Sequence, residues 1–125
     1  MKDEEIKYIN YQLIGLGLTI ITTIVAILIT YNQKLHLEGK KELFNSNKSL
    51  KITKINRTTI LLIGILFLYI NYKLYKISKE EGENLKSYKL QITASSLTTI
   101  SSIIALYVVY LSNTETIADV ENPTI

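Results

Sequence analysis

The side chains that could carry out catalysis are few and lie far apart in the chain. His36 is the only histidine, and with the neighbouring Glu38 it supplies too few ligands for a zinc site. The only aspartates, Asp3 and Asp119, lie near the two ends, so no Ser-His-Asp set can be argued. The chain contains no cysteine, which excludes a thiol nucleophile and cysteine metal ligands. We therefore predict no catalytic residues, no metal, no cofactor and no enzyme activity.

One group of polar side chains is dense enough to suggest a role. Seven hydroxyls lie within the ten positions from 93 to 102, in an otherwise apolar run. Such hydroxyls either bond back to carbonyls of their own helix or help to hold helices together. The functional alternative is a polar seam that lines a water-filled path when several copies assemble. The candidates for that polar lining are Gln12, Gln91, Ser95, Thr99 and Ser102.

The hydroxyl-rich segment belongs to one of three long runs that are poor in charge. The first and third runs are long enough to cross a hydrocarbon layer of about 30 Å as helices, at a rise of about 1.5 Å per residue. We predict an all-α membrane protein with three transmembrane helices and two charged loops. Its single membrane domain would cover residues 1–112, with spans at about 9–31, 56–72 and 90–112, and residues 113–125 would form an acidic, disordered tail.

The two charged loops carry several local signals. In residues 32–56 we predict a short amphipathic helix that lies on the headgroups, followed by a turn at Asn45 and an N-cap at Asn56. In residues 73–89, Ser78 and Glu81 have the spacing of a capping box.

The tyrosines support these spans because all nine fall near span ends, as in an interfacial aromatic belt. Arg57 and Lys73 enclose only 15 residues, so both must extend toward the interfaces. The predicted interface anchors are Tyr8, Tyr31, Arg57, Tyr72, Lys73, Tyr88 and Tyr110.

The first and third spans resemble each other at an offset of 79 residues, and each carries small residues at positions i, i+4, i+7 and i+11. In lipid, close approach of small residues and hydroxyl hydrogen bonds drive helix association. We predict that these spans pack through the two stripes, within one chain or between copies, and that the second span lies outside. The stripes are Gly15, Thr19, Thr22 and Ala26, and Ala94, Thr98, Ser101 and Ala105.

The basic residues indicate a lipid partner but leave the orientation open. With three spans, seven of the 14 lysines and arginines lie on each side of the membrane. The flanks of the third span favour an N-terminus inside and a C-terminus outside, whereas those of the first span favour the first loop inside. The balanced count also permits insertion in both orientations. The positive charges lie beside apolar runs, so we expect them to bind anionic headgroups and not nucleic acid. Use of Ile, Lys and Asn is heavy, as in an AT-rich genome, and we expect a bacterial plasma membrane.

Three functions are compatible with these features. The first is a structural or interaction protein, which self-associates or serves as an accessory subunit through its small-residue stripes. The second is a holin-like pore or channel lined by the hydroxyl-rich third span. The third is a membrane immunity protein or transporter accessory. The expected partners are the lipid bilayer and either further copies of the chain or another membrane protein.

Overall fold

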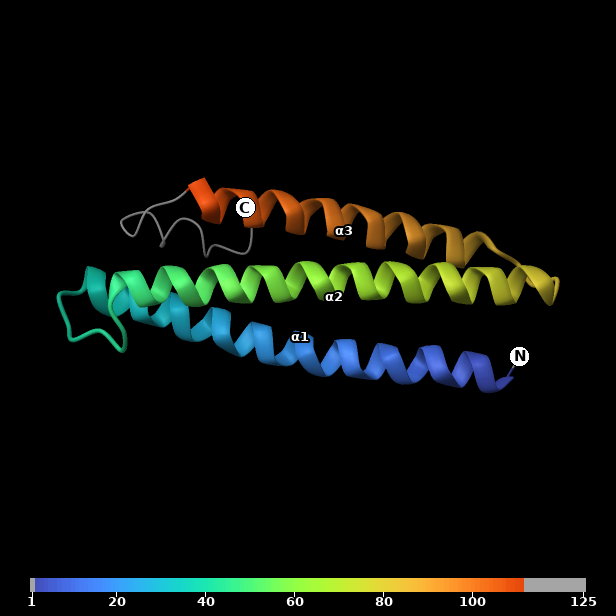
Figure 1. The fold of residues 1–125 in the computed structure, drawn as a ribbon, viewed down its shortest axis with the longest axis horizontal. Coiled ribbons are helices and arrows are strands. Elements are labelled where there is room, and N and C mark those ends of the chain that lie inside the picture. Colours follow the sequence, from blue (N-terminus) through green and yellow to red (C-terminus); the bar gives the residue numbers. More distant parts are fainter. Residues whose placement is uncertain (1, 112–125) are drawn as a thin grey trace.

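The computed structural model describes residues 2–111, which form three α-helices (Figure 1). These are α1 (Lys2–Leu37), α2 (Ser46–Glu80) and α3 (Lys86–Leu111). All three are long and apolar enough to span a membrane. The predicted all-α membrane fold with three spans is therefore confirmed. The predicted disordered tail, residues 113–125, lies outside the described residues.

The helices are longer than the predicted spans, because helical structure continues past the apolar segments. α1 has 36 residues and α2 has 35, whereas about 20 cross the hydrocarbon core. The prediction of a short separate amphipathic helix in the first loop was wrong, because α1 itself continues to Leu37. It ends before Gly39, whose φ of 70° favours glycine and closes the helix.

The predicted N-cap of the second span was also wrong. α2 begins ten residues earlier than Asn56, at Ser46, and its N-cap is Asn45. The side-chain oxygen of Asn45 accepts a hydrogen bond from the backbone N–H of Lys48 at 2.8 Å. The turn signal at Asn45 is thus the start of the helix. Lysines on the first turns of α2 concealed this start. Hydropathy identifies the part of a helix that lies in the membrane, and it does not identify a polar extension of the same helix.

The capping box predicted from Ser78 and Glu81 does not form. Ser78 is buried inside the last turns of α2, and Glu81 is the C-cap of that helix. The backbone N–H of Glu81 donates to the carbonyl of Ile77, and the N–H of Glu83 donates to the carbonyl of Ser78. Gly82, with a φ of 74°, allows the chain to turn toward α3.

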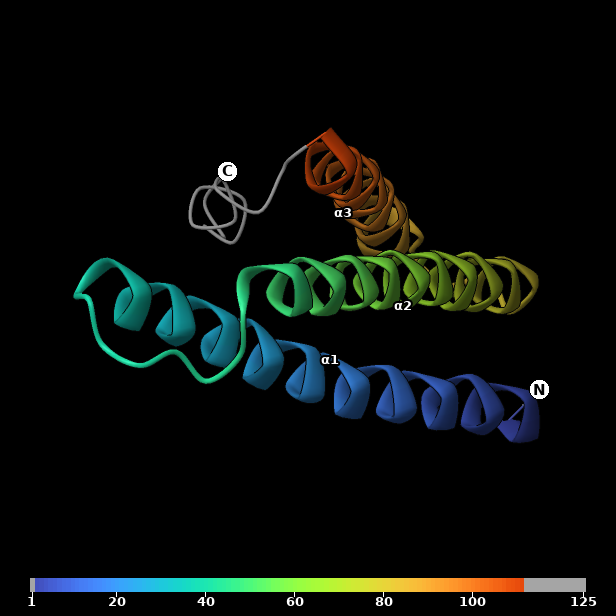
Figure 2. The same ribbon diagram turned by 60° about the vertical axis from the view of Figure 1, so that its left-hand side comes forward.

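α2 lies between the other two helices, as two views of the molecule show (Figures 1 and 2). Within the described residues, α1 and α3 each pack against α2 and make no contact with each other. Within one chain, the prediction that spans 1 and 3 pack together with span 2 outside was therefore wrong. Packing of the two stripes between copies remains a prediction.

The buried positions recur every seven residues, which is the spacing of coiled-coil packing. On α2, Ile63, Ile70 and Ile77 follow this spacing, and on α3 Ser102 and Val109 do. The corresponding buried residues of α1 are Tyr8, Gly15, Thr22 and Ile29. A single contact line of mixed residue types therefore runs along α1, and small, polar and large side chains alternate in it.

Candidate functional site

Two asparagines join the helices directly inside the apolar region. The Asn56 side-chain amide of α2 donates to the backbone carbonyl of Thr22 in α1 at 3.1 Å. The Asn71 amide of α2 donates to the hydroxyl of Ser95 in α3. Both bonds cross between helices, and the one from Asn56 is buried, so each supplies a specific polar contact between its pair of helices.

A third asparagine ties the first loop to both helices. Asn32 at the end of α1 donates to the Phe44 carbonyl at 3.0 Å and to the Ser49 hydroxyl at 3.4 Å. Its side-chain oxygen accepts from the backbone N–H groups of Leu43 and Phe44. None of the three asparagines was predicted from the sequence to join helices. The sequence signal that could have identified them is an asparagine within an apolar helix. The backbone of that helix cannot satisfy the hydrogen bonds of the side-chain amide, so the amide needs a partner on another element.

The small-residue stripe of the first span is divided between two surroundings. Gly15 faces α2, and a Cβ atom there would lie 2.8 Å from Cζ of Phe67. Thr22 is buried against α2, and Ala26 is half-buried. Thr19 is exposed, and its hydroxyl donates to the carbonyl of Gly15 at 2.8 Å. Half of the stripe therefore packs in the monomer, although against α2 instead of α3.

On α3, three of the four residues expected to line a polar path, Ser95, Thr99 and Ser102, face α2. Ser102 is buried, and Thr99 packs over Gly64 of α2. The hydroxyls of Thr99 and Ser102 donate to carbonyls of their own helix, at 2.8 and 2.9 Å. Ser95 accepts the bond from Asn71. These three hydroxyls thus serve packing and backbone bonding in the monomer.

The stripe of the third span is largely uncovered. Ala94, Thr98 and Ser101 are exposed, and Ala105 is half-buried. Within residues 2–111, no hydrogen bond is found from the hydroxyls of Thr98 and Ser101, in contrast to those of their neighbours Thr99 and Ser102.

This stripe borders a groove between α2 and α3, which α1 lines only at one end, through Gln12. Two pockets, of about 390 and 330 Å³, follow each other along the groove, and Thr98 lines both. The smaller pocket brings together the side chains of Gln12 from α1 and Gln91 from α3, which are 79 positions apart in the sequence. Other lining residues are Gly64, Phe67, Asn71, Ala94 and Ser95 in the smaller pocket, and Arg57, Ile60, Leu97, Ser101, Ser102 and Ala105 in the larger.

The predicted interface anchors lie at both ends of the bundle, in different surroundings. Tyr31, Tyr72 and Tyr110 are exposed on its outer surface, whereas Tyr8 is only 4% exposed and packs edge-to-face against Tyr69. The ammonium of Lys54 lies 4.9 Å from the Tyr110 ring centroid. Of the other predicted anchors, Lys73 lies over Tyr69, and Tyr88 and Arg57 are half-buried.

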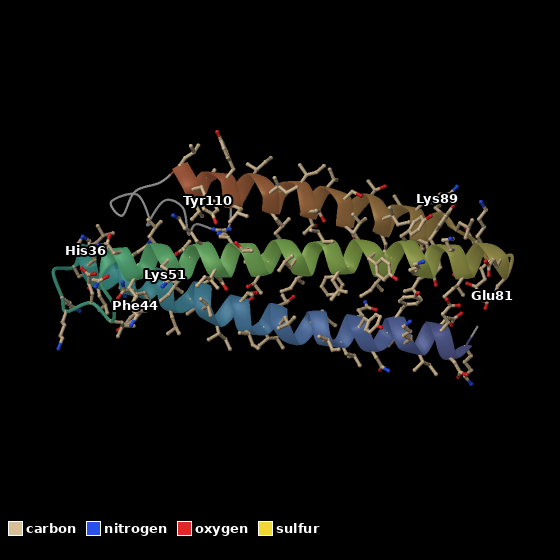
Figure 3. All side chains as sticks on the ribbon, viewed as in Figure 1. His36, Phe44, Lys51, Glu81, Lys89 and Tyr110 are labelled. Atoms are coloured by element: carbon tan, nitrogen blue, oxygen red, sulfur yellow. The ribbon has the colours of Figure 1, made fainter. Side chains whose placement is uncertain are left out.

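Apart from Arg57, the charged side chains of residues 2–111 lie toward the two ends of the molecule (Figure 3). His36 contacts Glu42 at the loop end, and Glu81 lies at the opposite end. A side-chain hydrogen bond with Glu83, followed by partial desolvation and repulsion from Glu5, raises the pKa of the Glu81 carboxyl. In residues 2–111, no three His, Cys, Asp or Glu side chains lie close enough to hold a metal ion. Comparison of the chain with protein-family models, curated proteins and solved structures gives no match.

Proposed function

We propose that the chain is a small integral membrane protein of structural or interaction type, which associates with a second copy of itself through α3. The main observation that supports this proposal is the largely uncovered stripe beside the groove, formed by Ala94, Thr98, Ser101 and Ala105. We place it in a bacterial plasma membrane. An accessory role beside another membrane protein would use the same surface.

The surrounding lipid determines which contacts can hold two copies together. Lipid tails are as apolar as leucine, so helices associate in a membrane through close packing and hydrogen bonds. Ala94 with Thr98, and Ser101 with Ala105, form two pairs of small residues four positions apart, which lets a second backbone approach closely. The hydroxyls of Thr98 and Ser101 can then donate across the contact, each with a contribution of about 0.6–2 kcal/mol.

The experiment replaces both hydroxyl residues of the stripe. Thr98→Leu combined with Ser101→Leu should weaken association in an in-membrane reporter by about tenfold, because two bonds and the close approach are lost. The matched control is Ser96→Leu combined with Thr93→Leu, which changes two hydroxyl residues of the same helix outside the stripe. Unchanged association of the Thr98 and Ser101 variant would contradict the proposal.

A second candidate function is a pore of the holin kind, favoured by the polar side chains that gather in the smaller pocket. Gln12, Asn71, Gln91 and Thr98 all line it. If copies assemble around this pocket, the amides could face a water-filled path. Controlled expression with a membrane-potential dye separates the two functions. Sudden depolarisation favours the pore, and steady potential with intact association favours the interaction protein.

A further inference from the structure

The smaller pocket of the groove, of about 330 Å³, brings together two carboxamides that are not hydrogen-bonded to the described part of the chain. Gln12 of α1 and Gln91 of α3 both line it. Within residues 2–111 neither side chain makes a hydrogen bond, whereas the amide of Asn71, in the same pocket, donates to Ser95. Each carboxamide carries two N–H donors. Near the hydrocarbon, where water is scarce, an amide without a partner costs free energy, so both amides favour an occupant that accepts hydrogen bonds.

The depth of this pocket follows from the length of α2. The 20 residues from Lys54 to Lys73 rise about 30 Å, which matches the hydrocarbon thickness and places Lys73 at one boundary. Asn71 is two residues inside Lys73, so it lies about 3 Å below that boundary. Gly64, which also lines the pocket, lies about 14 Å below it. The pocket thus begins at the edge of the hydrocarbon and continues toward the bilayer centre.

Gln12 lies just inside the same boundary. The approach of Gly15 to the Phe67 ring places these two residues at one level of the bundle. Phe67 is six residues inside Lys73, about 9 Å below the boundary, and Gln12 is three residues outward of Gly15. Its Cα therefore lies about 4 Å below the boundary.

Gln91 lies on the outer side of this boundary. The hydrogen bond from Asn71 to Ser95 places these two residues at one level, about 3 Å below the boundary. Gln91 is four residues outward of Ser95, which places it about 3 Å above the boundary. The two amides thus lie on either side of the level where the headgroup region meets the hydrocarbon.

We propose that this pocket binds the acyl-ester region of a glycerolipid from the surrounding bilayer. Such a lipid carries two ester carbonyls on neighbouring glycerol carbons, between its headgroup and its acyl chains. One carbonyl accepts from Gln12 and the other from Gln91, so the two amides need not meet at a single point. The first carbons of an acyl chain pass Phe67 and Ala94, and the rest of the chain stays in the bilayer.

The shape and exposure of the pocket favour lipid as the occupant. Gln91, Ala94 and Thr98 are exposed, so the pocket opens toward the bilayer along α3. Its amides lie near the depth of the ester groups, and its inner part is lined by Gly64 and Phe67. Its volume is near the lower limit of ordinary ligand sites, which suits the ester region and the first methylenes of a larger molecule.

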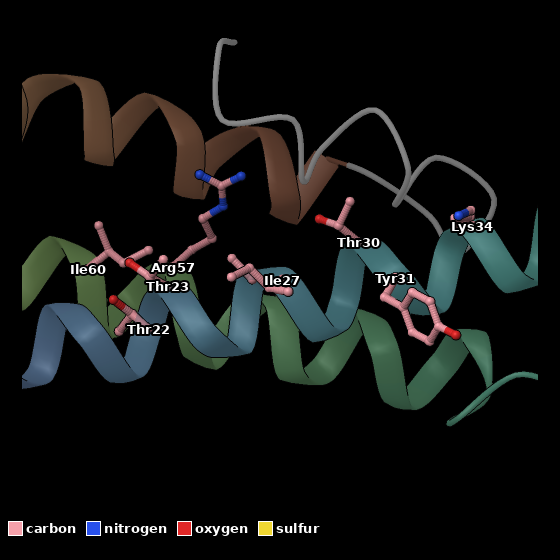
Figure 4. A pocket seen from close by; sticks show the side chains of 9 residues that line it. Thr22, Thr23, Ile27, Thr30, Tyr31, Lys34, Arg57 and Ile60 are labelled. Carbon is pink, nitrogen blue, oxygen red and sulfur yellow. The ribbon is translucent and has the colours of Figure 1, made fainter.

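Another pocket, of about 630 Å³, lies between α1 and α2 and offers different groups (Figure 4). The hydroxyls of Thr22 and Thr23, which line it, each donate to the backbone carbonyl of Thr19. Among the described residues, no carboxamide lines this pocket. The smaller pocket is therefore the better site for an ester, because its donors are not already used.

The inference does not depend on the proposed self-association, although the two share residues. Ala94 and Thr98 belong both to this pocket and to the stripe of α3. A bound lipid and a second copy would therefore compete for this part of the helix.

The test measures lipid retention by the full chain in native mass spectrometry, after extraction from bilayers with equal amounts of an ester-linked phosphatidylcholine and its ether-linked analogue. The two lipids share their headgroup and chain length and differ in the ester carbonyls. We expect the ester lipid to be retained about tenfold better. Gln12→Leu and Gln91→Leu should each lower this preference by about threefold, the effect of one hydrogen bond, and the double variant should abolish it.

Asn10→Leu is the matched control, because Asn10 is an exposed amide of α1 that does not line the pocket. Gln91→Lys keeps N–H donors at the exposed position and should retain most of the preference, which separates a lost hydrogen bond from misfolding. Equal retention of the ester and ether lipids, or equal effects of Asn10→Leu and Gln91→Leu, would overturn the proposal. A preference confined to dimers would also overturn it, because the amides would then belong to a contact between copies.

Discussion

The Asn56 amide of α2 lies 3.1 Å from the backbone carbonyl oxygen of Thr22 in α1, and donates a hydrogen bond to it. A helical carbonyl keeps a second lone pair after its bond within the helix, so it can accept this amide without breaking the helix. Asn56 is 5% exposed and Thr22 is 4% exposed. The bond therefore acts in apolar surroundings, where few alternative partners exist, and it fixes one register of the two helices.

Loss of this bond should loosen α1 from α2. We expect Asn56→Ala to lower the free energy of unfolding by about 0.6–2 kcal/mol, the range for polar contacts between membrane helices. Unfolding in mixed micelles by a denaturing detergent would measure it. Asn10→Ala is the matched control because Asn10 is exposed on α1. Equal effects of the two changes would show that the amide bond contributes nothing specific.

The contact of Gly15 with Phe67 gives a second prediction. A Cβ atom at Gly15 would lie 2.8 Å from the ring, whereas one at Gly17 would meet nothing within 4 Å. Gly15→Leu should therefore destabilise the bundle by about 1–3 kcal/mol through overpacking. Gly17→Leu should change stability by about 0.5 kcal/mol or less.

A double mutant shows whether the ring is the obstacle at Gly15. In a Phe67→Ala background the ring is absent, so the added cost of Gly15→Leu should shrink. The same detergent titration measures all four proteins of this cycle. An undiminished cost would mean that something other than Phe67 opposes the larger side chain.

The N-cap at Asn45 gives a third prediction. Its side-chain oxygen satisfies the otherwise unpaired N–H of Lys48. Asn45→Ala should cost about 1 kcal/mol of stability, and Asn45→Asp should preserve most of it, because aspartate caps equally well. Amide hydrogen exchange should report faster exchange at Lys48 in the alanine variant. Unaltered exchange there would contradict the assigned helix start.

Stability should also depend on pH at the opposite end of the bundle. Glu83, desolvation and Glu5 raise the pKa of Glu81, so the folded state favours its protonated form. The stabilisation is present below the ordinary carboxyl range and is lost as the pH rises through the raised pKa. The wild-type protein should thus unfold more easily at neutral pH than in mild acid.

Glu81→Gln should remove this dependence, because glutamine keeps the shape without the charge. At neutral pH the variant should be more stable than the wild type, and the difference should narrow in acid. Glu80→Gln is the control from the adjacent position. A pH profile that Glu81→Gln leaves unaltered would assign the dependence to other groups.

The runs without charged residues predicted the three spans, but they did not predict where the helices begin and end. α1 and α2 continue into charged segments such as those around Lys34 and Lys51, since a helix outside the hydrocarbon needs no apolar residues. The N-cap signal at Asn45 was present in the sequence and was interpreted as a turn, because the hydropathy boundary lay near Asn56.

The order of the helices could not be predicted, because small residues show where helices can approach and not which helix approaches. Gly15 and Thr22 do lie in a helix contact, although with α2. On α3, the neighbouring line of Thr99 and Ser102 faces α2, and the predicted stripe does not. Lipid and a neighbouring helix are equally apolar, so hydrophobicity alone cannot distinguish these two faces.

Because α1 and α3 contact only α2 within the described residues, every packing partner is also the next helix in the chain. During synthesis, α2 can dock on α1 as soon as both have left the translocon, and α3 can then add to the finished hairpin. Neither α1 nor α2 has to remain unpacked until a helix that is not its neighbour in the chain has been synthesised. The three helices can therefore pack one after another while the chain is being synthesised.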